Sequence, residues 1–144
     1  LFGLDISANL YASLGHKIVR NYERQQPYAN QLDYILDRWT IDNPSNDVPI
    51  VTTSINRNGV FSDFYVEDGS FFRLKSLQIG YNIAGPTAER IGLRKMRIYY
   101  SGTNLLTFTK YSGFDPEVGA GFGIDRGIYP QARVNTIGLN ITFK

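Results

Sequence analysis

The feature that most constrains this chain is an alternation of apolar and polar residues that persists through four separate segments. The first covers residues 2–14, "FGLDISANLYASL", in which every even position is apolar and most odd positions are polar. The other three cover about residues 71–83, 96–108 and 133–143. Successive side chains of a β-strand point to opposite faces, so this period of two predicts four strands, each with one apolar and one polar face.

The length of these segments and the chemistry of their polar face distinguish them from ordinary globular strands. A globular strand is usually about 5–6 residues long, whereas a strand that crosses an outer membrane has about 9–11 residues and is tilted. Serine, threonine, asparagine and glycine recur on the polar face, in place of lysine and glutamate. Such residues suit a crowded, wet barrel lumen, and the apolar face would then contact lipid. The residues expected to face lipid are Leu77, Ile79, Tyr81, Ile98, Tyr100, Ile137, Leu139, Ile141 and Phe143, with tyrosines 81 and 100 and phenylalanine 143 at the boundaries of the apolar band.

The connections between the predicted strands alternate in length. Residues 15–70 and 109–132 form long connections, and only about a dozen residues join the second strand to the third. Long extracellular loops and short periplasmic turns are typical of outer-membrane barrels. Four strands cannot close a barrel, and open sheet edges are not tolerated in lipid. The predicted fold is therefore all-β: the C-terminal antiparallel strands of a large transmembrane β-barrel, either as a piece of a longer chain or as one chain of a split barrel.

The composition narrows the remaining classes. The chain has no cysteine, so it has no disulfide framework and no thiolate chemistry. It contains no apolar run near the roughly 18 residues of a transmembrane helix. A net charge of +2 without a clustered basic patch is no footprint of nucleic-acid binding. Because no signal peptide is visible, we expect that the chain starts inside a longer protein or lacks its export signal.

Four quoted stretches carry a family resemblance when they are taken together and in order. They are "DRWTIDNPSNDVP", "YVEDGSFFRLKSLQIGYNI", "MRIYYSGTNLLTFTKYSGFDPEV" and "GIYPQARVNTIGLNITFK". The chain resembles the C-terminal end of the SusC/RagA-type TonB-linked outer-membrane transporters, most closely from about Tyr65 onward. The chain ends with Phe143 and Lys144, whereas the family often ends on the aromatic residue.

The resemblance implies a function and a set of partners. It implies a large barrel with a plug domain in the outer membrane of a Gram-negative, Bacteroidota-type bacterium. The plug, the TonB-box region and most of the barrel would lie outside this chain. The partners expected are the rest of the barrel with its plug, TonB through the missing N-terminal region, outer-membrane lipid and a SusD-like surface lipoprotein. The cargo expected is glycan or peptide fragments, and no enzymatic activity and no cofactor are implied.

The stretch "YSGFDPEV", residues 111–118, raises the question of a catalytic site because it holds two carboxylates. We expect the carboxylates of Asp115 and Glu117 to point to opposite sides of the segment, and no nucleophile or histidine accompanies them, so acid/base catalysis is disfavoured. Proline restricts its own backbone and that of the preceding residue, and aspartate caps nearby N–H groups in turns. We therefore predict a rigid corner between strand and loop, formed by Gly113, Phe114, Asp115, Pro116 and Glu117.

Other candidate positions lie in the predicted loops. The segment 42–49, "DNPSNDVP", has the oxygen-rich composition of a degenerate calcium loop, but it lacks the glycine and the final glutamate of an EF-hand. The single histidine, His16, is expected to be solvated just past the first strand. Arg73 and Lys75 share the phase of the lipid-facing residues and are expected above the membrane. The candidates for contact with cargo or partner at the outer mouth are Trp39, Tyr65, Tyr111, Phe122, Arg126 and Tyr129.

Two other classes of protein stay open at this point. A passive porin or a secretion-type barrel would also have these strands, and the presence of an N-terminal plug in the whole protein would discriminate it. A soluble β-rich glycan-binding module would have similar composition, and its solubility without detergent would identify it. An enzyme is the weakest candidate because no set of nucleophile, base and acid can be assembled.

Overall fold

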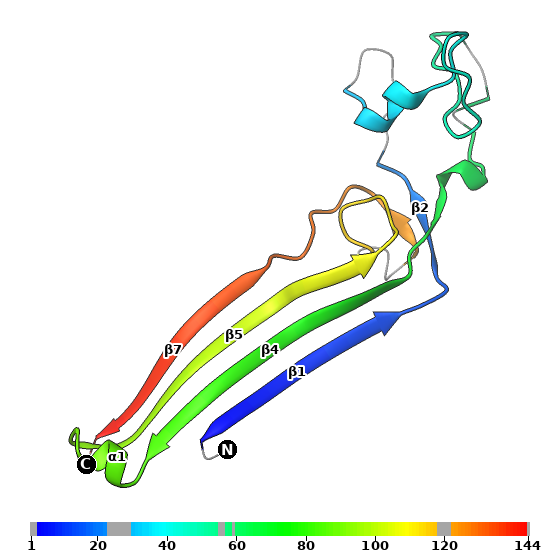
Figure 1. Ribbon diagram of the computed structural model, residues 1–144. Helices are drawn as coiled ribbons and strands as arrows, with labels where there is room; N and C mark the ends of the chain where they lie inside the picture. The colour runs from blue at the N-terminus through cyan, green and yellow to red at the C-terminus, as the bar shows by residue number, and fades with distance from the viewer. Residues whose placement is uncertain (1–2, 23–29, 55–56, 59, 118–121, 144) are drawn as a thin grey trace.

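The structure is a computed structural model that describes residues 3–22, 30–54, 57–58, 60–117 and 122–143. One antiparallel sheet of four long strands dominates it, in the spatial order β1-β4-β5-β7 (Figure 1). The prediction of an all-β, antiparallel fold is confirmed. These strands are β1 (Leu4–Ser13), β4 (Phe71–Ala84), β5 (Leu93–Thr109) and β7 (Val134–Phe143). Position 2, where the first strand was expected to begin, lies outside the described residues.

A second, smaller sheet lies at one end of the large sheet, which we call the rim end (Figure 1). In it β2 pairs antiparallel with β3 and parallel with β6. Its strands fall within the segments that the sequence predicts as loops, as do two 3-10 helices. The bounds are β2 (Lys17–Arg20), β3 (Val66–Asp68), β6 (Ile124–Asp125), η1 (Asp33–Asp37) and η2 (Asp63–Tyr65).

The opposite end of the large sheet, which we call the turn end, carries the short link between β4 and β5. This link forms a single helical turn, α1 (Pro86–Glu89), entered through Gly85 at a φ of 69°. Glycine adopts this left-handed conformation without steric cost, and proline suits the first helical position. Within the described part of the chain, no helix is long and apolar enough to cross a membrane.

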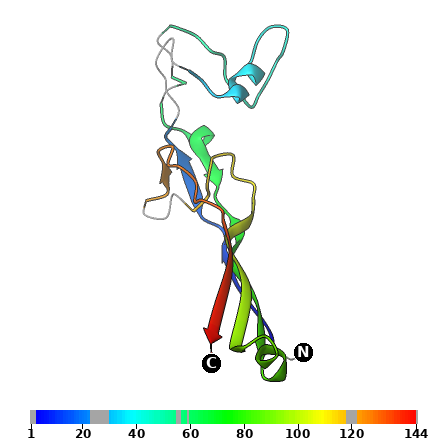
Figure 2. The same cartoon turned by 90° about the vertical axis from the view of Figure 1, so that its left-hand side faces the viewer.

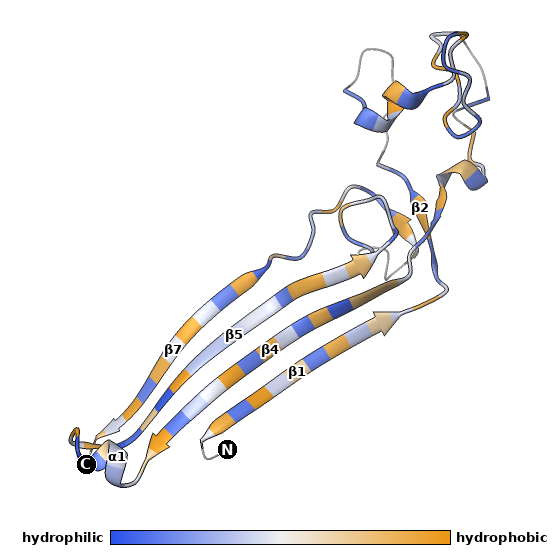
Figure 3. Ribbon diagram, viewed as in Figure 1, coloured by the Kyte–Doolittle hydropathy of each residue, from blue (hydrophilic) through white to orange (hydrophobic). Residues whose placement is uncertain are grey.

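The large sheet is a single layer. Figure 2 shows it edge-on, as one twisted ribbon with no second layer packed on it. Apolar and polar residues alternate along its strands in Figure 3. Apolar side chains therefore stay open, including Ile6 at 63% exposure, Ile137 at 82% and Phe143 at 71%. A soluble sheet buries its apolar face, so this sheet requires another apolar medium or partner against that face.

The strand register shows which of these open apolar side chains lie on the same side of the sheet. We call this side the apolar face. Ile79 pairs with Ile6 and with Tyr100, and the row continues to Ile137 of β7. The adjacent row contains Tyr81, Ile98 and Leu139 in the same way. All nine residues expected to face lipid lie on the apolar face. Their contact with lipid itself stays a prediction.

Bulges near the rim end change the register by one residue from strand to strand. Asn9 and Leu10 of β1 are consecutive, but their β4 partners Ser76 and Leu74 are separated by one extra residue. The partners of Ser76 and Leu74 in β5 are Thr103 and Leu106, which are separated by two. A β-bulge inserts an unpaired residue, bends the strand and redirects the side chains beyond it. At this level β4 therefore has one residue more than β1, and β5 has two more.

These bulges correct two expectations. The odd insertion in β4 turns Leu74 toward the apolar face and Arg73 toward the polar face, so the predicted phase of Arg73 is wrong. Lys75, the inserted residue, also lies on the polar side, with Nζ 4.6 Å from the centroid of the Tyr11 ring. The even insertion in β5 preserves the phase of that strand, and Asn104 takes a φ of 51° within it.

The apolar face ends in an aromatic pair at the rim end. Phe72 and Phe108 pair across β4 and β5 with ring centroids 6.3 Å apart. Tyr100 lies in the middle of the apolar face, not at its boundary as predicted. Its hydroxyl donates a hydrogen bond of 2.7 Å to Oδ1 of Asn135 on the same face. This bond gives the hydroxyl a partner without water, which an apolar medium requires.

The polar face carries an ion pair near the turn end. Nη2 of Arg97 lies 2.6 Å from Oδ2 of Asp5, and Nδ2 of Asn82 donates to Oδ1 of the same carboxylate at 2.8 Å. These side chains cross over Gly80, where a Cβ atom would lie 2.7 Å from Nη2 of Arg97. The pair is partly open, because the side chains of Arg97 and Asp5 are 28% and 44% exposed.

The two faces give a paired test of the orientation of the sheet. Leu139→Arg puts a charge on the apolar face, where an arginine near the bilayer midplane costs about 2–4 kcal/mol. Thr136→Arg puts the same charge on the polar face, three positions away in β7. In the full-length protein we expect the first variant to lower the folded fraction much more than the second, as measured by heat-modifiable gel mobility. Equal losses would contradict the assignment of the apolar face to lipid.

Candidate functional site at the rim

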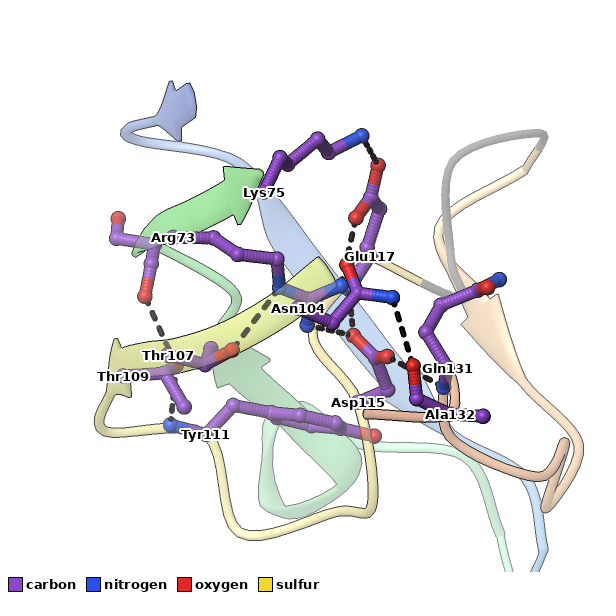
Figure 4. Close-up of polar contacts among 11 residues, drawn as sticks. Arg73, Lys75, Asn104, Thr107, Thr109, Tyr111, Asp115, Glu117, Gln131 and Ala132 are labelled. Atoms are coloured by element: carbon purple, nitrogen blue, oxygen red, sulfur yellow. Dashed lines mark hydrogen bonds and ion pairs between the residues drawn. The ribbon is translucent and has the colours of Figure 1, made fainter. Parts of the chain in front are cut away.

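The predicted corner after β5 folds back onto β4 through one arginine (Figure 4). Nη2 of Arg73 lies 2.5 Å from Oδ1 of Asp115, and Nη1 lies 2.7 Å from Oε2 of Glu117. Nε of the same guanidinium donates to Oγ1 of Thr107 at 2.9 Å. Arg73 and Asp115 are only 3% and 2% exposed. Each guanidinium nitrogen thus has its own acceptor, which is the condition under which a buried arginine is tolerated.

The carboxylate of Asp115 also closes the base of the loop. Its Oδ1 accepts the backbone N–H of Glu117 at 2.9 Å, and its Oδ2 accepts that of Gln131 at 3.1 Å. The first bond is the aspartate turn that the sequence predicts, and the second joins two points sixteen residues apart. The expectation that Asp115 and Glu117 point to opposite sides is wrong: residues i and i+2 share a side even in an extended segment, and here the chain turns and both carboxylates reach Arg73.

Lys75 completes a group of four charges that we call the rim cluster: Arg73, Lys75, Asp115 and Glu117. Nζ of Lys75 lies 2.5 Å from Oε1 of Glu117, so Glu117 receives one cation on each oxygen (Figure 4). Two positive and two negative side chains balance. Both carboxylates of the rim cluster are paired with a cation, so the cluster is suited to fixing the position of the chain.

A second set of bonds ties the same loop to the small sheet. The hydroxyl of Tyr111 donates to Oδ2 of the fully buried Asp125 at 2.7 Å. The backbone and hydroxyl of Ser112 donate to Glu67 of β3 at 2.9 and 2.6 Å. Glu67 in turn pairs with Nε of Arg20 of β2 at 3.0 Å. The loop is therefore fixed to the large sheet on one side and to the small sheet on the other.

The protonation states of the loop follow from these contacts. Burial raises the pKa of Asp115, but the hydrogen bond from Arg73 and the N–H groups of Glu117 and Gln131 outweigh it and hold the pKa below its usual range. Burial, followed by the hydrogen bond to Asp125, raises the pKa of Tyr111 well above its ordinary value. Asp115 is thus an anion and Tyr111 a neutral donor at neutral pH.

Comparisons with known proteins find relatives that cover almost the whole chain. The chain is 37% identical to the TonB-dependent receptor P3 of Formosa agariphila over 152 residues, which cover 96% of this chain and 15% of that receptor. It is 27% identical to the TonB-dependent receptor SusC of Bacteroides thetaiotaomicron, over 96% of this chain and 14% of that receptor. No protein-family model matches the chain.

Solved structures match the fold as well as the sequence. The RagAB peptide transporter superposes with a TM-score of 0.75 at 31% identity, over 96% of this chain and 16% of that one. The RagAB peptide importer in the open-open state gives a TM-score of 0.74 at 30% identity, over 98% and 16%. The chain has the sequence and the fold of the C-terminal segment of a SusC/RagA-type TonB-dependent receptor. It spans about 15% of the length of the curated relatives that it matches.

Within this receptor segment, the six predicted mouth residues separate into buried and open groups. Tyr65 and Tyr111 are 9% and 6% exposed, and the hydroxyl of Tyr65 donates to the carbonyl of Asn58 at 2.6 Å. The expectation that these two rings are offered to cargo is wrong, because both are packed inside the rim. The open residues are Trp39 at 38%, Phe122 at 95% and Tyr129 at 92% exposure, together with exposed Arg126.

The structure also bears on the predictions for His16 and for the segment 42–49. His16 is half-buried, not solvated. Its Nδ1 lies 3.1 Å from the Ser13 hydroxyl, and its ring lies edge-on to the Phe71 ring with 6.0 Å between the ring centroids. In the segment 42–49, the Ser45 hydroxyl accepts the N–H groups of Asp47 and Val48 in a compact turn. In the part of the chain that the structure describes, no three acidic, histidine or cysteine side chains gather as a metal site.

The lowered pKa of Asp115 makes the closed loop sensitive to acid. A carboxyl whose folded pKa is depressed contributes its full stability above its ordinary pKa of about 4, and loses it as the pH falls toward the lowered value. We expect hydrogen exchange at the Glu117 and Gln131 amides, corrected for intrinsic rate, to accelerate below about pH 4. Asp115→Asn should remove this pH dependence in the same receptor. A pH dependence that survives Asp115→Asn would contradict the assignment to Asp115.

Proposed function

We propose that the chain is part of the barrel wall of an outer-membrane, TonB-dependent nutrient importer. The observation that carries the proposal is the single-layer sheet, whose apolar face is open along its length and whose other face is polar. A barrel wall places lipid against one such face and a wet lumen against the other. The similarity to TonB-dependent receptors supports import driven through TonB. The setting is the outer membrane of a Bacteroidota-type bacterium, which the sources of the curated relatives also support.

In this proposal the mechanism is gated passage and involves no bond chemistry. Cargo is held at the outer mouth, and a plug that is encoded outside this chain is rearranged when TonB acts on it. The large sheet contributes wall and lumen lining. The rim cluster and the small sheet hold the loop after β5 above the lumen. On this reading β1 and β5 run outward and β4 and β7 inward.

The finer part of the proposal concerns cargo and partner. The cargo would be glycan or peptide fragments, and the structurally similar RagAB is a peptide importer. The partner would be a SusD-like surface lipoprotein. Residues 30–54, 57–58 and 60–62 support a partner, because they extend away from the large sheet in Figure 1 and leave many large apolar side chains open. They are Leu32, Leu36, Trp39, Ile41, Ile50, Val51, Val60 and Phe61.

The alternatives are less well supported. A passive porin or secretion barrel has the same kind of wall, but the sequence similarity is to TonB-dependent receptors. A soluble glycan-binding module does not keep an apolar face of this extent open to water.

Import is tested in cells with the full-length receptor and the SusD-like lipoprotein proposed here as its partner, which would be sought in the neighbouring gene. Two probe pools are offered: tryptic casein peptides and maltooligosaccharides, each fluorescently labelled. We expect uptake of one pool by the wild-type strain, and its loss after deletion of the TonB gene or addition of a protonophore. Uptake that continues without TonB and without the proton-motive force would instead identify a passive barrel.

The partner is tested on the open apolar segment. Ile41 is 85% exposed, and the polar residue Thr53 of the same segment is also exposed. Ile41→Asp should weaken co-purification with the neighbouring lipoprotein, since a charge is placed in an apolar contact, whereas Thr53→Asp should not. If both variants retain the lipoprotein at the wild-type level, this segment is not its docking surface.

A further inference from the structure

We propose that Arg73 is a positioning residue for the mouth, which fixes the loop after β5 to the barrel wall and thereby sets how well cargo is captured. This inference rests on the proposed importer function and deepens it. The role of Arg73 begins with the β4 bulge: if regular pairing continued through Lys75, residue 73 would point to the apolar face. The bulge turns Arg73 to the polar face, where its guanidinium meets Asp115 and Glu117. Bulges at barrel rims commonly redirect a side chain in this way.

The second step is that one carboxylate connects three parts of the chain. Asp115 receives Arg73 of β4, the N–H of Glu117 beside it and the N–H of Gln131 at the far end of the loop. Arg73 is therefore linked to both ends of the segment that runs from 115 to 131. Removing its charge would leave the carboxylate buried without a cation, and the base of the loop would open.

Two open aromatic rings lie at the base of the loop. Phe114, which is 65% exposed, is adjacent to Asp115, and Tyr129, which is 92% exposed, is two residues before Gln131. Both open rings thus stand next to a bond that depends on the Asp115 carboxylate. Open aromatic rings at fixed positions offer contact area at a low cost in conformational entropy. If the base opens, these rings lose their fixed positions, while the β4–β5 ladder remains.

The fourth step links the loop to the rest of the rim. The loop also holds the small sheet through the Tyr111–Asp125 bond and the Ser112–Glu67 bonds. Between β2 and β3, the small sheet carries the open apolar side chains of residues 30–54, 57–58 and 60–62. Arg73 therefore orients the surface proposed for the partner as well as the two rings. The contacts of Arg73 with Asp115 and Glu117 are called the clamp. We assign the effect to cargo capture, because Phe114 and Tyr129 lie closest to the clamp along the chain.

The experiment uses the full-length receptor with its lipoprotein, and the labelled pool that the wild type imports. Arg73→Met keeps an unbranched apolar stem and removes the charged guanidinium group, Arg73→Lys keeps the charge without the fork, and Glu117→Gln removes only the charge of the less buried carboxylate. Arg97→Met is the matched control, since Arg97 forms an ion pair on the same polar face at the turn end. We expect Arg73→Met to raise the half-saturating concentration several-fold with little change in maximal uptake, and Arg73→Lys and Glu117→Gln to have smaller effects. Arg97→Met should leave both quantities near wild type.

A purely structural role would lower the maximal uptake together with the amount of folded receptor and leave the half-saturating concentration unchanged, and this result would overturn the proposal. Hydrogen exchange at the Glu117 and Gln131 amides of purified receptor separates the inference from the importer function. Unchanged protection in Arg73→Met would overturn the clamp even if import is normal. Faster exchange there supports the clamp, and a wild-type receptor that imports neither pool would count against the proposed importer function and not against the clamp.

Discussion

The whole structure depends on the requirement that backbone N–H and C=O groups in an apolar medium find partners within the protein. The long antiparallel ladders of β1, β4, β5 and β7 meet this requirement along their shared edges. Once the backbone is satisfied, side chains of one face can be apolar without any core beneath them. This explains a sheet with almost no buried interior, in which the buried side chains gather mainly at the rim. Ile18, Phe71 and Asp125 are there, at 0%, 3% and 0% exposure.

The rim begins where this requirement ends. Four residue pairs beyond the bulges, the ladders of β4 with β1 and with β5 end, and side chains there satisfy part of the loop backbone. Asp115 accepts two backbone N–H groups, and Glu67 accepts one from Ser112. The graded insertion of no residue, one residue and two residues across β1, β4 and β5 also bends the strands together, because bulges increase local twist. The bulges therefore bend the wall and also place Arg73, the cation that holds the loop, on the polar face.

The long strands could be predicted from sequence because a period of two over more than ten residues is a strong signal. The corner residues could also be named, since proline, glycine and aspartate have specific turn chemistry. The phase of Arg73 could not, because a single inserted residue reverses a face without altering composition. The two-residue β6 and the burial of Tyr65 and Tyr111 were equally out of reach, since they depend on contacts between segments distant in sequence. The expectation of opposed carboxylates was wrong even for an extended backbone, in which residues i and i+2 point to the same side, and the proline-containing segment in fact turns.

Two ion pairs on the same polar face differ in burial, and this difference explains why we assign a functional role to the pair at the rim. Arg97 and Asp5 are 28% and 44% exposed, and exposed pairs of this kind contribute about 0–1 kcal/mol. Arg73 and Asp115 are 4% and 3% exposed in their side chains, and removing one partner of such a buried pair costs roughly 3–5 kcal/mol. A well-packed apolar pair would often be at least as stable there, so stability alone does not account for buried charges. Directional bonds to several acceptors at once do account for them, because only a guanidinium can join β5, Asp115 and Glu117 in one defined geometry.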